Sequence, residues 1–211
     1  MNLGQLTRAL EIGVMRKDLA AEYQNYINTA LREIQAQYTF TCMAHQENLT
    51  WRAGNVWVAL PYDFKELQKG RGQIEVCGRP VDVTNRAMLK RLGLRYGRWR
   101  TPGLTRAPAF ACWLEFQNGE PVVRTQHPMG EDAPVTVFYY RYLPPLAKAT
   151  DENALTREFP LLVLNRAKAG LFALINDDER AGVALQLFEK DFRHAQHTDE
   201  LRRIGGVRTQ T

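Results

Sequence analysis

The chain of 211 residues contains no serine, few cysteines and no long apolar run. The absence of serine excludes a serine nucleophile and the hydrolases that depend on one. Cys42, Cys77 and Cys112 are far apart and odd in number, so they predict buried reduced thiols. No run approaches the roughly 18 apolar residues of a membrane helix, and Met1–Gln5 lacks the start of a secretory signal. We therefore expect a protein made in a cytoplasm, without membrane contact.

The histidines and carboxylates form no catalytic or metal-binding pattern. His194 and His197 lie three residues apart, but no further ligand pattern accompanies them. The acidic run 177–179 suits the first turn of a helix, where the helix dipole favours negative charge. We therefore expect no enzyme activity, no cofactor and no metal.

Apolar residues recur at helical spacing at both ends of the chain and at a spacing nearer two between them. Asn2 is a candidate cap for a first helix, and a second is predicted from Asp18. Later helices are predicted from Pro160 and from a capping box at Asn176. We predict an α+β fold with three parts, namely a helical bundle of residues 1–37 and 150–200, an inserted antiparallel β domain of residues 38–149, and an extended tail of residues 201–211.

Turn signals divide the middle of the chain into short strands. Strands are predicted at 38–44, 49–51, 56–60, 73–77, 81–83, 110–116, 121–124 and 135–142. Hairpins are predicted around Arg52–Asn55, around Gly78–Pro80 and around the Asn118-Gly119 pair. One short helix is predicted at 85–92.

Three stretches carry a resemblance to the head-to-tail adaptor, or connector, proteins of tailed bacteriophages. Gly54–Phe64 is similar to their hairpin that ends in Leu-Pro-x-Asp-Phe, and Val135–Pro145 to a strand that leads into a proline. Asn153–Ala181 resembles their pattern from an Asn-x-Leu start to an Asp-Asp-Glu-Arg-Ala end, although Leu161 stands where the family often has aspartate. The order of elements is also similar to that of gatekeeper, or upper tail-tube, proteins of short-tailed phages.

This resemblance implies a structural virion protein that is located in the phage neck. It implies a ring, expected to hold twelve copies, that docks beneath the portal protein. It also implies a central channel for the genomic DNA, through which the genome passes during ejection. The opposite face of the ring is expected to receive a tail nozzle, a tail-tube protein or tail fibres. We expect the subunit to stay monomeric until the portal templates the ring.

Two surfaces are assigned to partners on this basis. In the resembling proteins the C-terminal end often reaches into the portal, so portal docking is assigned to the tail residues Leu201, Arg202, Arg203, Ile204, Val207 and Arg208. Exposed loops on a rigid scaffold are common recognition sites. Two loops expected at one end of the β domain are therefore assigned to the tail partner, through Asn118, Gly119, His127 and Met129.

A basic segment between residues 79 and 106 is a third candidate surface. It mixes cations with aromatic residues, among them Arg86, Lys90, Arg91, Arg95, Arg98, Trp99, Arg100 and Arg106. Such a mixture suits an acidic protein neighbour or nucleic acid, and it also suits a solvated loop. The resemblance favours protein docking. The alternative function is that of a nucleic-acid-binding accessory protein.

Overall fold

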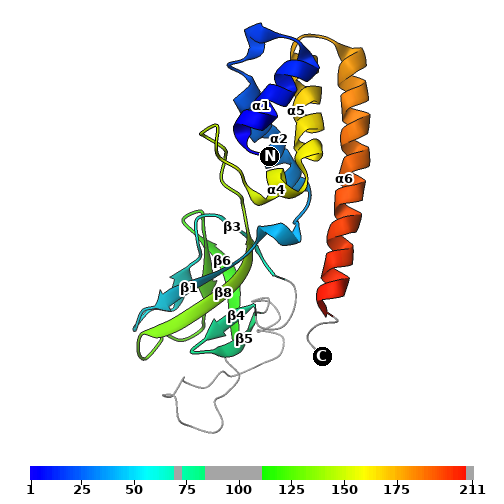
Figure 1. Ribbon diagram of the computed structural model, residues 1–211. Helices are drawn as coiled ribbons and strands as arrows, with labels where there is room; N and C mark the ends of the chain where they lie inside the picture. The colour runs from blue at the N-terminus through cyan, green and yellow to red at the C-terminus, as the bar shows by residue number, and fades with distance from the viewer. Residues whose placement is uncertain (69–72, 84–110, 208–211) are drawn as a thin grey trace. The chain divides into compact units, whose positions relative to one another are not determined.

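The computed structural model describes residues 1–68, 73–83 and 111–207. The chain divides into two compact units, and each is described by itself (Figure 1). The helical unit consists of Met1–Met43 and Leu143–Thr211, and the β unit consists of Ala44–Tyr142. Helices at both ends of the chain and strands between them confirm the predicted α+β class.

Five helices and two 3₁₀ turns form the described part of the helical unit. They are α1 (Leu3–Val14), η1 (Lys17–Leu19), α2 (Tyr23–Gln37), η2 (Thr41–Met43), α4 (Ala154–Glu158), α5 (Pro160–Leu174) and α6 (Asp178–Val207). The cap predicted at Asn2 is confirmed, because its side chain accepts a hydrogen bond from the Gln5 N–H within a capping box. The apolar stripe of α1 is fully buried, at Leu3, Leu6, Leu10 and Val14.

Three helix boundaries differ from the prediction. Helix α2 begins at Tyr23, because Asp18 lies in η1 and pairs with Arg16 instead of capping a helix. Helix α6 is capped by Asp177, whose Oδ1 accepts from the Arg180 N–H at 3.1 Å. The predicted extended tail is wrong over residues 201–207, since α6 continues through them, and residues 208–211 lie outside the described part.

Polar side chains of α2 hold the chain where it returns to the helical unit. The Asn28 side chain exchanges two hydrogen bonds with the Leu146 backbone, at 2.9 and 3.0 Å. The buried Gln35 accepts from the Leu143 N–H at 2.6 Å and donates to the Leu31 carbonyl. Because the Leu143 and Leu146 backbone groups lie outside regular structure, the amides of α2 supply the partners that a helix or sheet would otherwise provide.

Eight strands form the described part of the β unit, in the order β1-β8-β4-β5-β6-β7-β2, with β3 also paired to β8. They are β1 (Ala44–Trp51), β2 (Trp57–Ala59), β3 (Phe64–Leu67), β4 (Ile74–Val76), β5 (Arg79–Val83), β6 (Ala111–Gln117), β7 (Glu120–Arg124) and β8 (Ala133–Arg141). All described pairings are antiparallel except β5 with β6. The core lies around the fully buried Trp51, Ile74 and Val137.

Two of the predicted hairpins are confirmed, but the second turn lies at Cys77-Gly78, since the predicted turn residues Arg79 and Pro80 belong to β5. The β6–β7 turn has positive φ angles at Asn118 (54°) and Gly119 (86°), and the β4–β5 turn has them at Cys77 (53°) and Gly78 (72°). Two positive φ angles match the right-handed twist of the paired strands, and this explains why the Asn-Gly signal was reliable. Gly119 takes this backbone conformation without strain.

The remaining strand predictions need correction. The strand predicted at 38–44 is instead an irregular stretch followed by η2, and β1 begins only at Ala44. The hairpin predicted around 52–55 is also wrong, because β1 pairs with β8 while β2 pairs with β7. Local turn signals show that the chain bends, but they do not show which strand it pairs with next. The helix predicted at 85–92 lies outside the described residues.

Candidate interaction surfaces

The C-terminal part of α6 is anchored to the helical unit through one buried carboxylate. Asp199 is fully buried and accepts from the Thr41 N–H at 2.7 Å, the Thr41 hydroxyl at 2.5 Å and the Tyr38 hydroxyl at 3.3 Å. The Arg203 Nε–H donates to the same carboxylate at 3.0 Å, and its guanidinium lies 5.5 Å from the Tyr38 ring centroid. Burial and the Asp199 charge raise the pKa of Tyr38, with a partial offset from Arg203.

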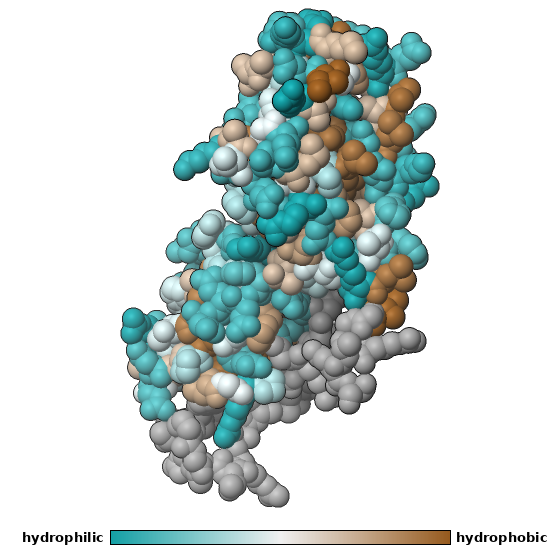
Figure 2. All heavy atoms as spheres, in the orientation of Figure 1, coloured by the Kyte–Doolittle hydropathy of each residue, from teal (hydrophilic) through white to brown (hydrophobic). Residues whose placement is uncertain are grey.

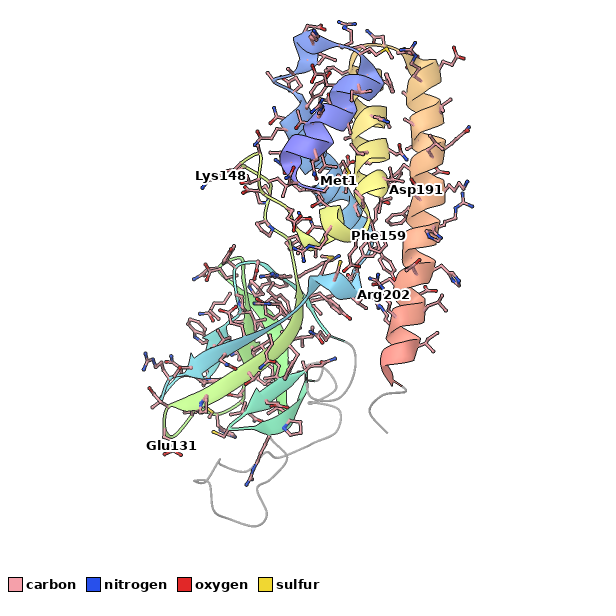
Figure 3. The ribbon with its side chains drawn as sticks, viewed as in Figure 1. Met1, Glu131, Lys148, Phe159, Asp191 and Arg202 are labelled. Carbon is pink, nitrogen blue, oxygen red and sulfur yellow. The ribbon has the colours of Figure 1, made fainter. Side chains whose placement is uncertain are left out.

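A second contact lies beside the first. Arg202 forms an ion pair with Glu158 of α4. Its guanidinium lies over the ring of Phe159, 6.0 Å from the centroid, and both residues are labelled in Figure 3. Burial and the nearby carboxylates raise the pKa of the Cys42 thiol to about 12, so this thiol stays protonated and unreactive near neutral pH. The contacts of Asp199 and of Arg202 together hold the C-terminal turns of α6 in a fixed position on the helical unit.

The predicted portal-docking residues therefore separate into two groups. Arg202 and Arg203 point into the helical unit and are used in internal ion pairs. Leu201 and Ile204 point outward and are 56% and 61% exposed. Their exposure leaves two large apolar side chains available on an anchored helix end. The Val207 side chain and all of Arg208 lie outside the described residues.

The loops assigned to a tail partner do not lie together. Strand β7 starts at the Asn118-Gly119 turn and ends before His127, so the two loops lie at opposite ends of this strand. Asn118, Gly119 and His127 are exposed, as predicted residues of a partner surface should be. Met129 is only 3% exposed and belongs to the β core. Its assignment to a partner surface is therefore wrong.

Sequence reasoning missed two aromatic residues at the Asn118-Gly119 end of the β unit. Tyr62 is 98% exposed and Phe116 is 75% exposed. They lie near the same turn, because Phe116 pairs with Pro121 and the Leu60 N–H donates to the Pro121 carbonyl at 3.0 Å. The alternation in β6 could not have identified Phe116 as exposed, since it shares a strand face with the buried Cys112.

An apolar groove crosses the helical unit between α1, α5 and α6. Its volume is about 260 Å³. Apolar and charged side chains both line it, and the lining residues include Phe172, Val183, Leu187, Lys168, Glu179 and Arg180. Apolar residues (brown) gather along the α6 side of the helical unit in Figure 2. The periodicity of α6 did not predict this surface, because the apolar residues of the helix do not concentrate on a single face.

Other classes of site find no support in the part of the chain that the structure describes. There, no group of three or more histidine, cysteine or acidic side chains could hold a metal ion. Nor does any helix among those residues have the length and apolar character needed to cross a membrane. The basic-segment residues from Arg86 to Arg106 lie outside the described residues, so their predicted role stays a prediction.

Exposed apolar side chains on anchored elements are typical of surfaces through which a protein contacts other proteins. The sequence matches the SU10 adaptor protein family over residues 1–210, and the chain belongs to that family. This identifies it as a bacteriophage adaptor, a structural protein of the virion, and confirms the resemblance found in the sequence. No match is found among curated proteins.

Proposed function

We propose that the chain is the subunit of a ring that joins the portal to the tail in the phage neck. The proposed ring holds twelve copies and surrounds a channel for the genomic DNA. Membership of an adaptor family supports this role, since an adaptor needs one surface for each of two partners. The observation that carries it is the anchored end of α6, where Leu201 and Ile204 are exposed on a helix that internal ion pairs hold in place.

The end of α6 is the proposed portal-facing surface. Docking there requires no ordering of residues 201–207, because they are already helical. Pre-formed structure lowers the free-energy cost of binding, since fewer backbone and side-chain rotations are lost. The energy of docking then comes from burial of Leu201 and Ile204, together with any contribution from Val207 and Arg208.

The Asn118-Gly119 end of the β unit is the proposed tail-facing surface. Tyr62 and Phe116 join the predicted turn residues there as exposed aromatics. Aromatic side chains are enriched at protein interfaces because they bury a large area with few rotatable bonds. A tail nozzle, a tail-tube protein or tail fibres are the partners that this surface is proposed to receive. His127 lies at the other end of β7 and is not part of it.

Binding to the purified portal protein of the same phage tests the portal-facing surface. We expect Leu201→Asp and Ile204→Asp each to weaken binding by tenfold or more, measured by sedimentation or calorimetry. The matched control is Ile12→Asp, which changes a residue of α1 that is 65% exposed. Equal portal affinity for the wild type and both α6 variants would show that the portal contacts another surface. No portal binding by the wild type would contradict the adaptor ring itself.

A further inference from the structure

We propose that neighbouring copies pack through α6, with one flank of this helix entering the α1–α5–α6 groove of the next copy. This inference rests on the proposed ring and names the surface that would build it. Helix α6 is covered by α5 on one side only, and both flanks of its first half carry exposed apolar residues. Those residues are Val183 (54%) and Leu187 (46%) on one flank and Leu185 (42%) on the other.

The groove suits a side chain better than a small molecule. Its volume of about 260 Å³ is below the range of about 300–1,000 Å³ that small-molecule sites occupy. Phe172, Val183 and Leu187 contribute apolar surface to its lining. Because water gains few hydrogen bonds against apolar surface, burial of this surface by an aliphatic side chain is favourable.

The opposite flank of α6 offers a complementary convex surface. Residues two apart on an α-helix differ by about 200° around its axis, so Leu185 faces away from Val183 and Leu187. Glu189 follows Leu185 by one turn and lies on the same flank, with its side chain 55% exposed. Lys168, Arg180 and Glu179 line the groove beside its apolar residues, so the neighbour's Leu185 meets an apolar lining, and its Glu189, which pairs with Arg193 within its own helix, meets one carboxylate and two cations.

These residues lie at matching levels along the helix axes if the two copies have the same orientation. Helices α5 and α6 run antiparallel, and Asn165 donates to Asp191 at 2.8 Å while Glu158 pairs with Arg202. Lys168 is one turn further along α5 than Asn165, so it lies level with the part of α6 just before residue 189. A neighbouring copy that is displaced sideways, with no shift along the helix axis, therefore places its Glu189 beside Lys168.

The partner that fits is a second copy in a head-to-tail contact. Two grooves facing each other would leave a void, so close packing disfavours a two-fold pair of grooves. A contact between two different surfaces of the same chain repeats from copy to copy, and it generates a closed ring when the rotation between copies closes. The side-by-side α6 helices of such a ring run parallel.

Disulfide trapping tests this contact even if isolated copies associate weakly. The double variant Lys168→Cys/Glu189→Cys is expected to form a ladder of covalent oligomers under mild oxidation. Each copy carries both cysteines, so it can form one disulfide with each of its two neighbours. An equimolar mixture of the two single variants is expected to form dimers and no longer species. Wild type under the same conditions controls for the native cysteines Cys42, Cys77 and Cys112.

A second pair of variants separates this contact from the ring itself. Leu185→Asp and Val183→Asp are expected to abolish assembly on the portal protein, while Ile12→Asp assembles like wild type. Absence of the ladder, both alone and on the portal protein, overturns the α6 contact. If wild-type rings still form there, the proposed function stands and the copies meet elsewhere. If wild type forms no ring with the portal protein, the proposed function fails first.

Discussion

Asp199 is predicted to contribute about as much to the stability of the helical unit as a large buried apolar side chain does. Its side chain is 1% exposed and accepts four hydrogen bonds, from Tyr38, Arg203 and two groups of Thr41. Removal of one partner from a buried ion pair costs about 3–5 kcal/mol. Because Arg203 is 30% exposed and can regain water, Asp199→Ala is expected at the lower end, about 3 kcal/mol. Asp199→Asn keeps an acceptor oxygen and is expected to cost roughly half as much.

The assay can report each unit separately. The four tryptophans are residues 51, 57, 99 and 113, so all of them belong to the β unit. In urea, ellipticity at 222 nm follows mainly the helical unit, and tryptophan fluorescence follows the β unit. With a slope of about 2 kcal/mol per molar urea, a loss of about 3 kcal/mol moves the helical midpoint by about 1.5 M. The fluorescence midpoint is expected to move less.

The control is Glu152→Ala, which removes an ion pair with Arg157 whose side chains are 42% and 66% exposed. Exposed pairs contribute about 0–1 kcal/mol, so this variant is expected to unfold like wild type. If Asp199→Ala changed the helical midpoint no more than Glu152→Ala does, the reasoning that a buried carboxylate anchors α6 would be refuted.

Three further predictions concern single positions. Gly119→Ala is expected to destabilise the β unit by about 1–2 kcal/mol because its φ is positive, whereas Gly130→Ala, which meets open space, is expected to be neutral in the same urea titration. Cys42 is expected to resist iodoacetamide at pH 8 in the native protein and to react after denaturation, as peptide mass spectrometry would show, since the pKa of its thiol is raised to about 12. The carboxyl of Asp132 is expected to titrate below 3.8 by NMR, because a backbone N–H and Arg52 lower its pKa. This contact therefore stabilises the fold above the unfolded pKa and is lost as the pH falls through the folded value, and Arg52→Ala lessens the shift without abolishing it.

The sequence predicted those features that depend on neighbouring residues. The cap at Asn2 and the Asn118-Gly119 turn were predicted because a few adjacent side chains determine them. The pairing of β1 with β8 was not, because the partners lie about ninety residues apart and no local signal encodes the choice. The family pattern predicted an adaptor, since it samples the whole chain at once.

The candidate surfaces were only partly predictable. Leu201 and Ile204 were assigned to a partner surface and are exposed. Arg202 and Arg203 were assigned with them, but the sequence could not reveal that Glu158 and Asp199 lie within reach. The groove was missed altogether, because three helices from both ends of the chain create it. Met129 was misplaced since a loop position alone does not show that a side chain turns back into the core.

The helical unit is assembled from two segments that the β unit separates in the chain, and this affects its synthesis. Helices α1 and α2 are complete by residue 37, but the segment that Asn28 and Gln35 hold begins only at Leu143. At about 5–20 residues per second, the apolar stripes of α1 and α2 wait roughly 6–25 s on the ribosome before α5 begins at Pro160. During that interval the nascent chain exposes the apolar side chains of Leu6, Leu10 and Ile27. We therefore expect host chaperones to bind it.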